Sequence, residues 1–179
     1  MSEVIKVFYS TAEDDGIAKY QQIFRDACEQ VGRLLDVHLD VIYWRDLPGG
    51  LGASAQSVID DRVSGQYEIY FGVLGIHFGS GTVHEYREAV EAHLKDGRPI
   101  SVCFGFCEEK VNPYSIEPNS LAELVQFRRD IGNGGKYGIA NLYFTFADGA
   151  VFRTRVENHL KHAINLIKGR VAGGRSFSA

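Results

Sequence analysis

The feature that most constrains the fold is one continuous apolar segment, residues 69–76, which reads Ile-Tyr-Phe-Gly-Val-Leu-Gly-Ile. A strand with one face in water alternates between apolar and polar residues, whereas this segment has no polar face. Such a run is typical of a strand that helices cover on both sides, as in a parallel sheet. We therefore expect a central strand here, between two layers of helices.

The rest of the chain alternates between short strand-like runs and helical stretches with one apolar face. Strands are predicted at residues 5–9, 39–43, 69–76, 99–106 and 140–146, and helices at residues 17–35, 54–63, 82–96, 120–131 and 149–167. Strict alternation of strands and helices favours right-handed βαβ units and a single sheet. We predict an α/β, flavodoxin-like three-layer fold with a five-stranded parallel sheet in the order 2-1-3-4-5.

Length and composition indicate one globular domain, which we assign to residues 1–168 of the 179. Residues 169–179 are expected to be a flexible tail.

The net charge of −4 disfavours nucleic acid as a direct partner, because no basic field would hold a phosphate backbone. No apolar run is long enough to cross a bilayer, and we find no signal peptide. Three cysteines without a CxxC pair fit a reducing compartment. We expect a cytoplasmic protein without membrane contact.

In a sheet of this order, ligands bind beyond the carboxyl ends of the strands, where the order reverses between strands one and three. The first strand ends at Tyr9 and is followed by Ser10 and Thr11, whose hydroxyls could meet a phosphate. The three carboxylates at residues 13–15 would repel a tightly held phosphate, which disfavours a flavin site. Those carboxylates could instead favour the N-terminus of the following helix.

The second strand is followed by Trp44 and Arg45. Trp44 could stack on a flat aromatic ligand, and Arg45 could bind phosphates through two parallel hydrogen bonds. In the alternative, Trp44 covers the core and Arg45 pairs with Asp46.

The third strand is followed by residues 77–86, which include the acidic residue Glu85. Gly79 would let the backbone turn and approach a ligand closely. We expect Glu85 in the first turn of the next helix, near the ligand-binding edge. The spacing Thr82-x-x-Glu85 also matches a capping box, in which Glu85 bonds only the backbone of Thr82. The spacing alone leaves both roles open.

The same loop carries His77 and Phe78, and His84 follows in the helix. The ring of Phe78 could support a flat base. The two histidines suggest a metal site, but no third ligand stands at a supporting spacing, so we expect no metal.

The segment 67–86 resembles the Toll/interleukin receptor (TIR)-like domains of bacterial defence proteins, in which a GTxxE(F/Y) motif opens the third helix. Residues 81–86, Gly-Thr-Val-His-Glu-Tyr, match that motif, and the resemblance extends over about residues 4–168. Related nucleoside deoxyribosyltransferases carry a similar motif, whose glutamate acts at the anomeric carbon of a nucleoside. Enzymatic TIR domains use one helix-borne glutamate to break the bond between nicotinamide and ribose in NAD.

The resemblance implies that Glu85 is the catalytic carboxylate of an NAD glycohydrolase or ADP-ribose cyclase in antiphage defence. Glu88 is a second candidate, because this helix is longer than in many relatives. NAD would be a substrate, no cofactor is expected, and copies of the chain would associate through TIR–TIR contacts. The residues expected to contact the substrate are Tyr9, Ser10, Thr11, Trp44, Arg45, His77 and Phe78. Two alternatives are a non-catalytic TIR-like signalling module and a glycosyl hydrolase or transferase acting on nucleosides or nucleotides.

Overall fold

The computed structural model describes residues 3–12, 15–43, 66–110, 116–132 and 143–174 of the chain. Its strands form one parallel sheet in the order β2-β1-β3-β4-β5. The strands are β1 (Glu3–Thr11), β2 (Val37–Tyr43), β3 (Ile69–Leu74), β4 (Ser101–Cys107) and β5 (Phe144–Phe146). The helices are α1 (Asp15–Leu35), α3 (Ser80–Asp96), α4 (Pro118–Gly132) and α5 (Gly149–Gly174). The predicted fold class and strand order are confirmed.

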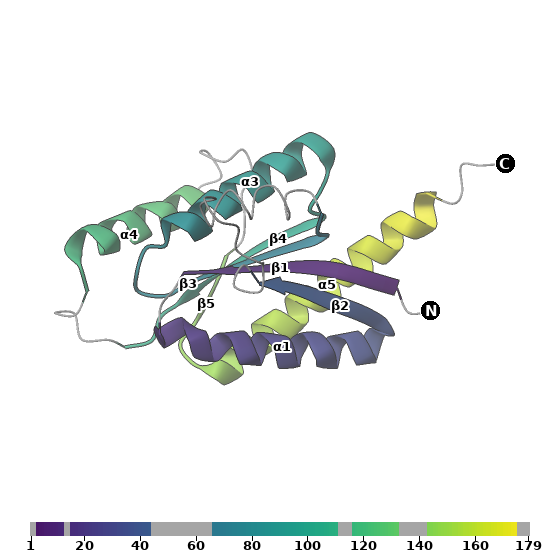
Figure 1. Cartoon of the computed structure of the whole chain (residues 1–179), viewed down its shortest axis with the longest axis horizontal. Coiled ribbons are helices and arrows are strands. Elements are labelled where there is room, and N and C mark those ends of the chain that lie inside the picture. The colour runs from purple at the N-terminus through teal and green to yellow at the C-terminus, as the bar shows by residue number, and fades with distance from the viewer. Residues whose placement is uncertain (1–2, 13–14, 44–65, 111–115, 133–142, 175–179) are drawn as a thin grey trace, which may run out of the picture.

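The helices form two layers, with α1 and α5 on one face of the sheet and α3 and α4 on the other (Figure 1). Successive residues of β1 pack against different helix layers, because side chains alternate between the two faces of a strand. Val7 and Tyr9 pack in the core under α1 and α5, whereas Phe8 packs in the core under α3 and α4. Every residue of β3 is buried, as its continuous apolar sequence predicted.

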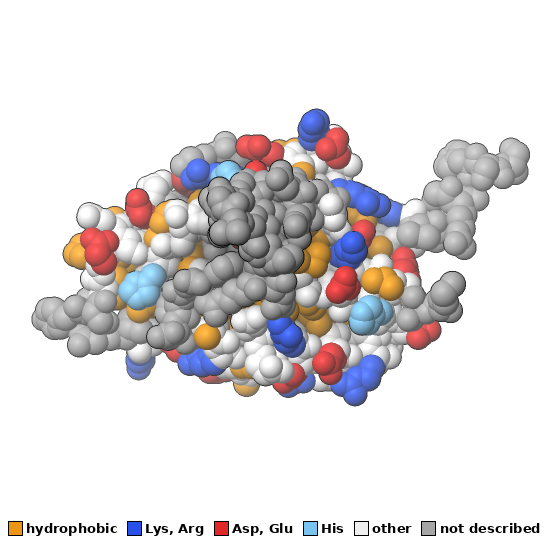
Figure 2. Space-filling model, in the orientation of Figure 1, with side chains coloured by type: hydrophobic (Ala, Val, Ile, Leu, Met, Phe, Trp, Pro, Cys, Tyr) orange, Lys and Arg blue, Asp and Glu red, His pale blue; other side chains and the backbone are white. Residues whose placement is uncertain are grey.

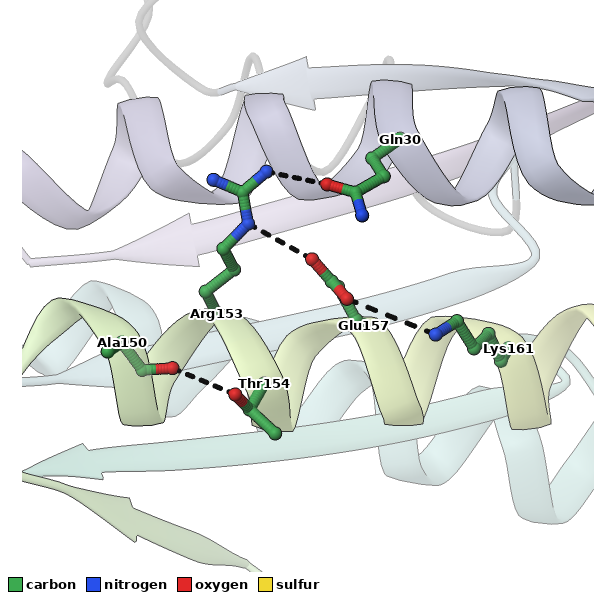
Figure 3. A network of polar contacts seen from close by, with 6 residues as sticks. All are labelled: Gln30, Ala150, Arg153, Thr154, Glu157 and Lys161. Atoms are coloured by element: carbon green, nitrogen blue, oxygen red, sulfur yellow. Dashed lines mark hydrogen bonds and ion pairs between the residues drawn. The ribbon is translucent and has the colours of Figure 1, made fainter.

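Polar contacts add to the apolar packing between α1 and α5. Nη2 of Arg153 donates to Oε1 of Gln30 in α1 at 2.7 Å, and Nε of Arg153 donates to Oε1 of Glu157 at 3.0 Å (Figure 3). Glu157 also lies 3.9 Å from Nζ of Lys161, one turn further along α5. Arg153 therefore connects the two helices of this layer at their solvent side.

The C-terminal helix extends further than the sequence suggested. α5 runs to Gly174, so its last turns occupy the first part of residues 169–179, which we expected to be a flexible tail. Two basic side chains hold this end against the body. Lys168 donates to the carbonyl of Leu35 at 2.8 Å, and Arg170 donates to the carbonyl of Gly97 at 3.1 Å.

Two predicted elements fall partly or wholly outside the described residues. These are the helix at 54–63 and the first residues of the fifth strand, 140–142. Within the described part, none of the helices has the length and apolar character needed to cross a bilayer. On the face seen in Figure 2, acidic and basic side chains of the described residues are interspersed.

Candidate functional site

The candidate site lies where β1 and β3 end side by side. The helix after β1 packs on one face of the sheet and the helix after β3 packs on the other, so the chain diverges at this edge (Figure 1). A divergence of this kind is where open α/β sheets bind their ligands. In the register of the two strands, Ser10 pairs with Gly72 and Thr11 with Val73.

At this edge a carboxylate from α3 meets a hydroxyl from β1. Oγ of Ser10 donates a hydrogen bond to Oε2 of Glu85. Both side chains are buried: Ser10 is 0% exposed and Glu85 is 6% exposed. A buried carboxylate needs such donors, because desolvation penalises an ionised group that lacks them. Residues 75 positions apart in sequence are thus joined in one polar contact.

Tyr70 of β3 extends this contact into a cluster. Its hydroxyl donates to the backbone carbonyl of Thr82 at 3.2 Å, which ties β3 to the first turn of α3. Burial raises the pKa of Tyr70 well above its ordinary value, the negative charge of Glu85 raises it further, and a hydrogen bond with Ser10 acts in the opposite direction. Four buried polar residues, Ser10, Tyr70, Thr82 and Glu85, therefore lie together at the carboxyl edge.

The capping box, one of the two roles that the spacing Thr82-x-x-Glu85 left open, is absent, and our expectation that Glu85 lies in the first turn of the helix is wrong. α3 begins at Ser80, its N-cap is Gly79, and no side chain caps it. Thr82 is therefore already inside the first turn, and Glu85 lies beyond that turn rather than in it. The carboxylate of Glu85 accepts a hydrogen bond from the Ser10 side chain on β1, and it lies beyond the first turn, where the helix N-terminus stabilises negative charge.

Gly79 is required here by close packing. A Cβ added to Gly79 would lie 2.6 Å from the Cβ of Ala12 and 3.2 Å from Cδ2 of Leu74. The segment leading into α3 therefore touches the segment leaving β1, and a side chain at position 79 would push the two apart. This contact sets how closely α3 approaches the end of β1.

Tyr9, which we expected to contact the substrate, does not share the cluster. Its ring is fully buried on the other face of the sheet, with ring centroids 4.4 Å from Phe24 and 5.5 Å from Tyr43. Adjacent strand residues point to opposite faces, so Ser10 and Tyr9 cannot both face α3. The hydroxyl of Tyr9 finds no hydrogen-bond partner among the described residues.

Of the other predicted contact residues, the structure describes Thr11, His77 and Phe78. Phe78 packs edge-on against Phe127 of α4, and its amide donates to Oγ of Ser120 at 2.7 Å. Thr11 is the last residue of β1, and His77 lies three residues after the end of β3; both are partly exposed. Trp44 and Arg45 lie outside the described residues.

The second candidate carboxylate occupies a different environment. Glu88 lies about one turn after Glu85, where its side chain is 39% exposed and 3.4 Å from Nε2 of His84. Glu85, in contrast, is buried against the strand end. Of the two carboxylates, Glu85 is the one that hydrogen-bonds a residue at the switch point of the sheet.

A second polar cluster lies at the carboxyl end of β4, on the α1 side of the sheet. The hydroxyl of Tyr20 donates to Oε1 of Glu109 at 2.5 Å, and Nζ of Lys19 contacts the same oxygen at 2.6 Å. Burial raises the pKa of the neighbouring Cys107 thiol. These contacts anchor the start of α1 to the end of β4.

Tyr70 and Thr82 were missed as site residues by sequence reasoning. A usable signal existed for Tyr70, since a phenol inside an otherwise apolar strand needs a buried hydrogen-bond partner. No comparable signal existed for Thr82, whose contribution is a backbone carbonyl.

Among the described residues, no three His, Cys, Asp or Glu side chains gather in a way that could hold a metal ion.

No protein-family model matches this chain, and no curated protein matches it. Among solved structures it is similar to the TIR domains of the activated Roq1 resistosome, which directly recognises the pathogen effector XopQ. The identity is 18%, over 90% of this chain and 84% of that chain, with a TM-score of 0.43. It is also similar to general stress protein 14 from Treponema denticola in complex with FMN, at 11% identity over 92% and 98% of the two chains and a TM-score of 0.36. Likenesses this distant indicate no function for the chain.

Proposed function

We propose that this chain is a TIR-like domain that cleaves NAD between nicotinamide and ribose, with Glu85 as the carboxylate beside the ribose. The observation that carries the proposal is the position of Glu85: a buried carboxylate, already accepting a hydrogen bond from a hydroxyl, at the switch point of the sheet. The match of residues 81–86 to the motif of enzymatic relatives supports the same residue.

The chemistry requires little beyond one such carboxylate. Nicotinamide in NAD carries a positive charge and leaves as a neutral base when its bond to ribose breaks, so no general acid is needed. The ribose becomes oxocarbenium-like, and a nearby carboxylate stabilises that positive charge. Attack by water at the anomeric carbon then gives ADP-ribose and a proton. Attack by a ring nitrogen of the adenine would give a cyclic product instead.

The Ser10–Glu85 bond is compatible with this role. The hydroxyl of Ser10 is the same kind of donor as a ribose hydroxyl, so Glu85 is arranged to accept from such a group. Low exposure strengthens electrostatic stabilisation, because the surroundings screen charge less than water does. A carboxylate that is 6% exposed must become reachable when substrate binds, so the proposal requires side chains around it to move.

The main alternative is a non-catalytic TIR-like module that acts by self-association. The same hydrogen bond that could prepare Glu85 for catalysis also satisfies a buried carboxylate in a purely structural way. In addition, α4 exposes Leu121 and Val125 at 42% and 41%, one turn apart on its outer face. An apolar pair of this kind is suited to contact with another protein surface.

The deciding experiment incubates concentrated protein with NAD and measures free nicotinamide. Glu85→Gln keeps the side chain's shape and an oxygen that can accept from Ser10 but removes the charge. We expect Glu85→Gln to lower the rate by roughly two orders of magnitude or more while the far-ultraviolet circular dichroism stays unchanged. Glu88→Gln is the matched control at the exposed position one turn later, and it should cleave NAD at close to the parent rate.

The other outcomes discriminate among the hypotheses. Loss of cleavage in Glu88→Gln but not in Glu85→Gln would move the catalytic role to Glu88 and keep the enzyme class. Release of bases from nucleosides but not from NAD would favour the nucleoside or nucleotide glycosyl hydrolase or transferase. No cleavage of either substrate, even by concentrated parent protein, would favour the signalling module. For the proposed role in bacterial antiphage defence, the readout is the NAD content of infected cells that carry the parent or the Glu85→Gln gene.

A further inference from the structure

Ser10 is held more rigidly than the glutamate that it contacts. It lies in β1, in the interior of the sheet, where its backbone pairs with Gly72 of β3, and its side chain is 0% exposed. A serine side chain has one torsion that places its oxygen, whereas a glutamate side chain has three. The strand therefore determines where the hydroxyl of Ser10 lies, and Glu85 must adapt its side chain to reach it.

The backbone of α3 is anchored at the same edge by other contacts. The hydroxyl of Tyr70 bonds the carbonyl of Thr82, and Val83 and Tyr86 are buried in the core under this helix. These contacts hold α3 against the sheet independently of the Ser10–Glu85 bond. The bond from Ser10 to Glu85 therefore bears on the orientation of the Glu85 carboxylate and not on the position of the helix.

We propose that Ser10 is a positioning residue for Glu85, holding its carboxylate in the orientation that faces the ribose; this inference rests on the proposed NAD cleavage. A carboxylate has about four lone-pair positions, so the bond from Ser10 leaves capacity for a ribose hydroxyl. Stabilising charge at the anomeric carbon requires the carboxylate to remain within about 3–3.5 Å of it. Without the hydroxyl of Ser10, this contact would no longer restrain the three torsions of Glu85.

The test compares kcat and KM for NAD in Ser10→Ala, which removes the hydroxyl, and Ser10→Thr, which keeps one. Ser10→Ala should lower kcat by roughly tenfold to a hundredfold with KM changed by less than about twofold, because orientation affects the reacting complex more than binding. Ser10→Thr should restore most of the lost kcat. Ser101→Ala is the matched control: Ser101 is also buried in a strand, but at the start of β4, and its variant should keep the parent kcat.

Each contrary result has a definite meaning when Glu85→Gln is measured beside these variants. If Glu85→Gln loses activity but Ser10→Ala keeps the parent kcat, the role of Ser10 is refuted and the proposed function stands. A rise in KM alone, or a folded Ser10→Thr that recovers nothing, also refutes it. If Ser10→Ala does not fold, Ser10→Cys, which has similar shape but a weak donor, should show the same fall in kcat. Absence of NAD cleavage by the parent refutes both proposals together.

Discussion

At the scale of single residues, the neighbouring residues Tyr9 and Ser10 of β1 place their side chains on opposite faces of the sheet. The side chain of Ser10 joins the polar cluster with Glu85, and that of Tyr9 enters the aromatic core with Phe24 and Phe71. Two tyrosines of neighbouring strands, Tyr9 and Tyr70, are both fully buried but differ in their hydroxyls. Tyr70 donates to the carbonyl of Thr82, whereas the Tyr9 hydroxyl has no hydrogen-bond partner within the described part of the chain.

Because only one of these hydroxyls has a partner, replacing each tyrosine by phenylalanine should have opposite effects on the stability of the protein. Tyr9→Phe removes a buried hydroxyl that has lost its hydrogen bonds to water, so the variant should be as stable as the parent or up to about 1 kcal/mol more stable. Tyr70→Phe removes a hydroxyl that bonds the carbonyl of Thr82, so it should cost about 1 kcal/mol or more. Urea unfolding curves, compared through their midpoints and slopes, give both values.

A loss of stability in Tyr9→Phe as large as that in Tyr70→Phe would contradict this view. It would mean that the Tyr9 hydroxyl bonds an internal water, which buried polar groups often do.

At the scale of elements, the close approach of α3 to the end of β1 places Glu85 within reach of Ser10. That approach depends on the absence of a side chain at Gly79, which faces Ala12. The Arg153 contacts on the other layer are exposed polar interactions, and such contacts contribute little to stability. We therefore expect substitution at the contact between Gly79 and Ala12 to change the free energy of unfolding more than substitution of Arg153.

Gly79→Ala should destabilise the protein by about 1–3 kcal/mol, because the added methyl group would lie 2.6 Å from the Cβ of Ala12. The double variant Gly79→Ala with Ala12→Gly removes that methyl–methyl clash and should recover part of the loss. Thermal or urea unfolding measures both.

Gly169→Ala is the control, since nothing lies within 4 Å of a Cβ at that helical position. It should leave stability unchanged or raise it, because alanine favours helix more than glycine does. Equal stability of Gly79→Ala and Gly169→Ala would show that the segment before α3 can move to accept the added methyl group without loss of stability.

At the scale of the whole molecule, α4 carries an exposed apolar pair, Leu121 and Val125, on its outer face. These two side chains are 42% and 41% exposed and offer an apolar surface for contact between copies of the chain. We propose that copies associate through this surface and that their assembly contributes to activity.

NAD cleavage should then rise faster than linearly with protein concentration, because the fraction of assembled copies grows with concentration. Initial rates over two decades of concentration, with light scattering on the same samples, test this. Rates strictly proportional to concentration, from a protein that stays monomeric, would count against assembly-dependent activity.

The amino-acid sequence by itself determined the architecture. The apolar run at 69–76 requires cover on both faces, and the alternation of strand and helix periodicities leads from there to a parallel sheet in the order 2-1-3-4-5. Both signals are local, because burial of a strand or helix face is encoded in the spacing of its own residues. Glu85 was also identifiable as a candidate, from the motif at 81–86.

Only the tertiary structure decided what Glu85 contacts. Ser10 lies 75 residues away, and their meeting depends on the register of β1 against β3 and on where α3 begins. The spacing left a capping bond to Thr82 open as one of two roles, because a capping box is a local motif. Tyr9 was expected at the site because it ends the first predicted strand, but strand alternation turns its ring to the opposite face. Hydrogen bonds between distant elements follow from how those elements pack, and no spacing within either element encodes that packing.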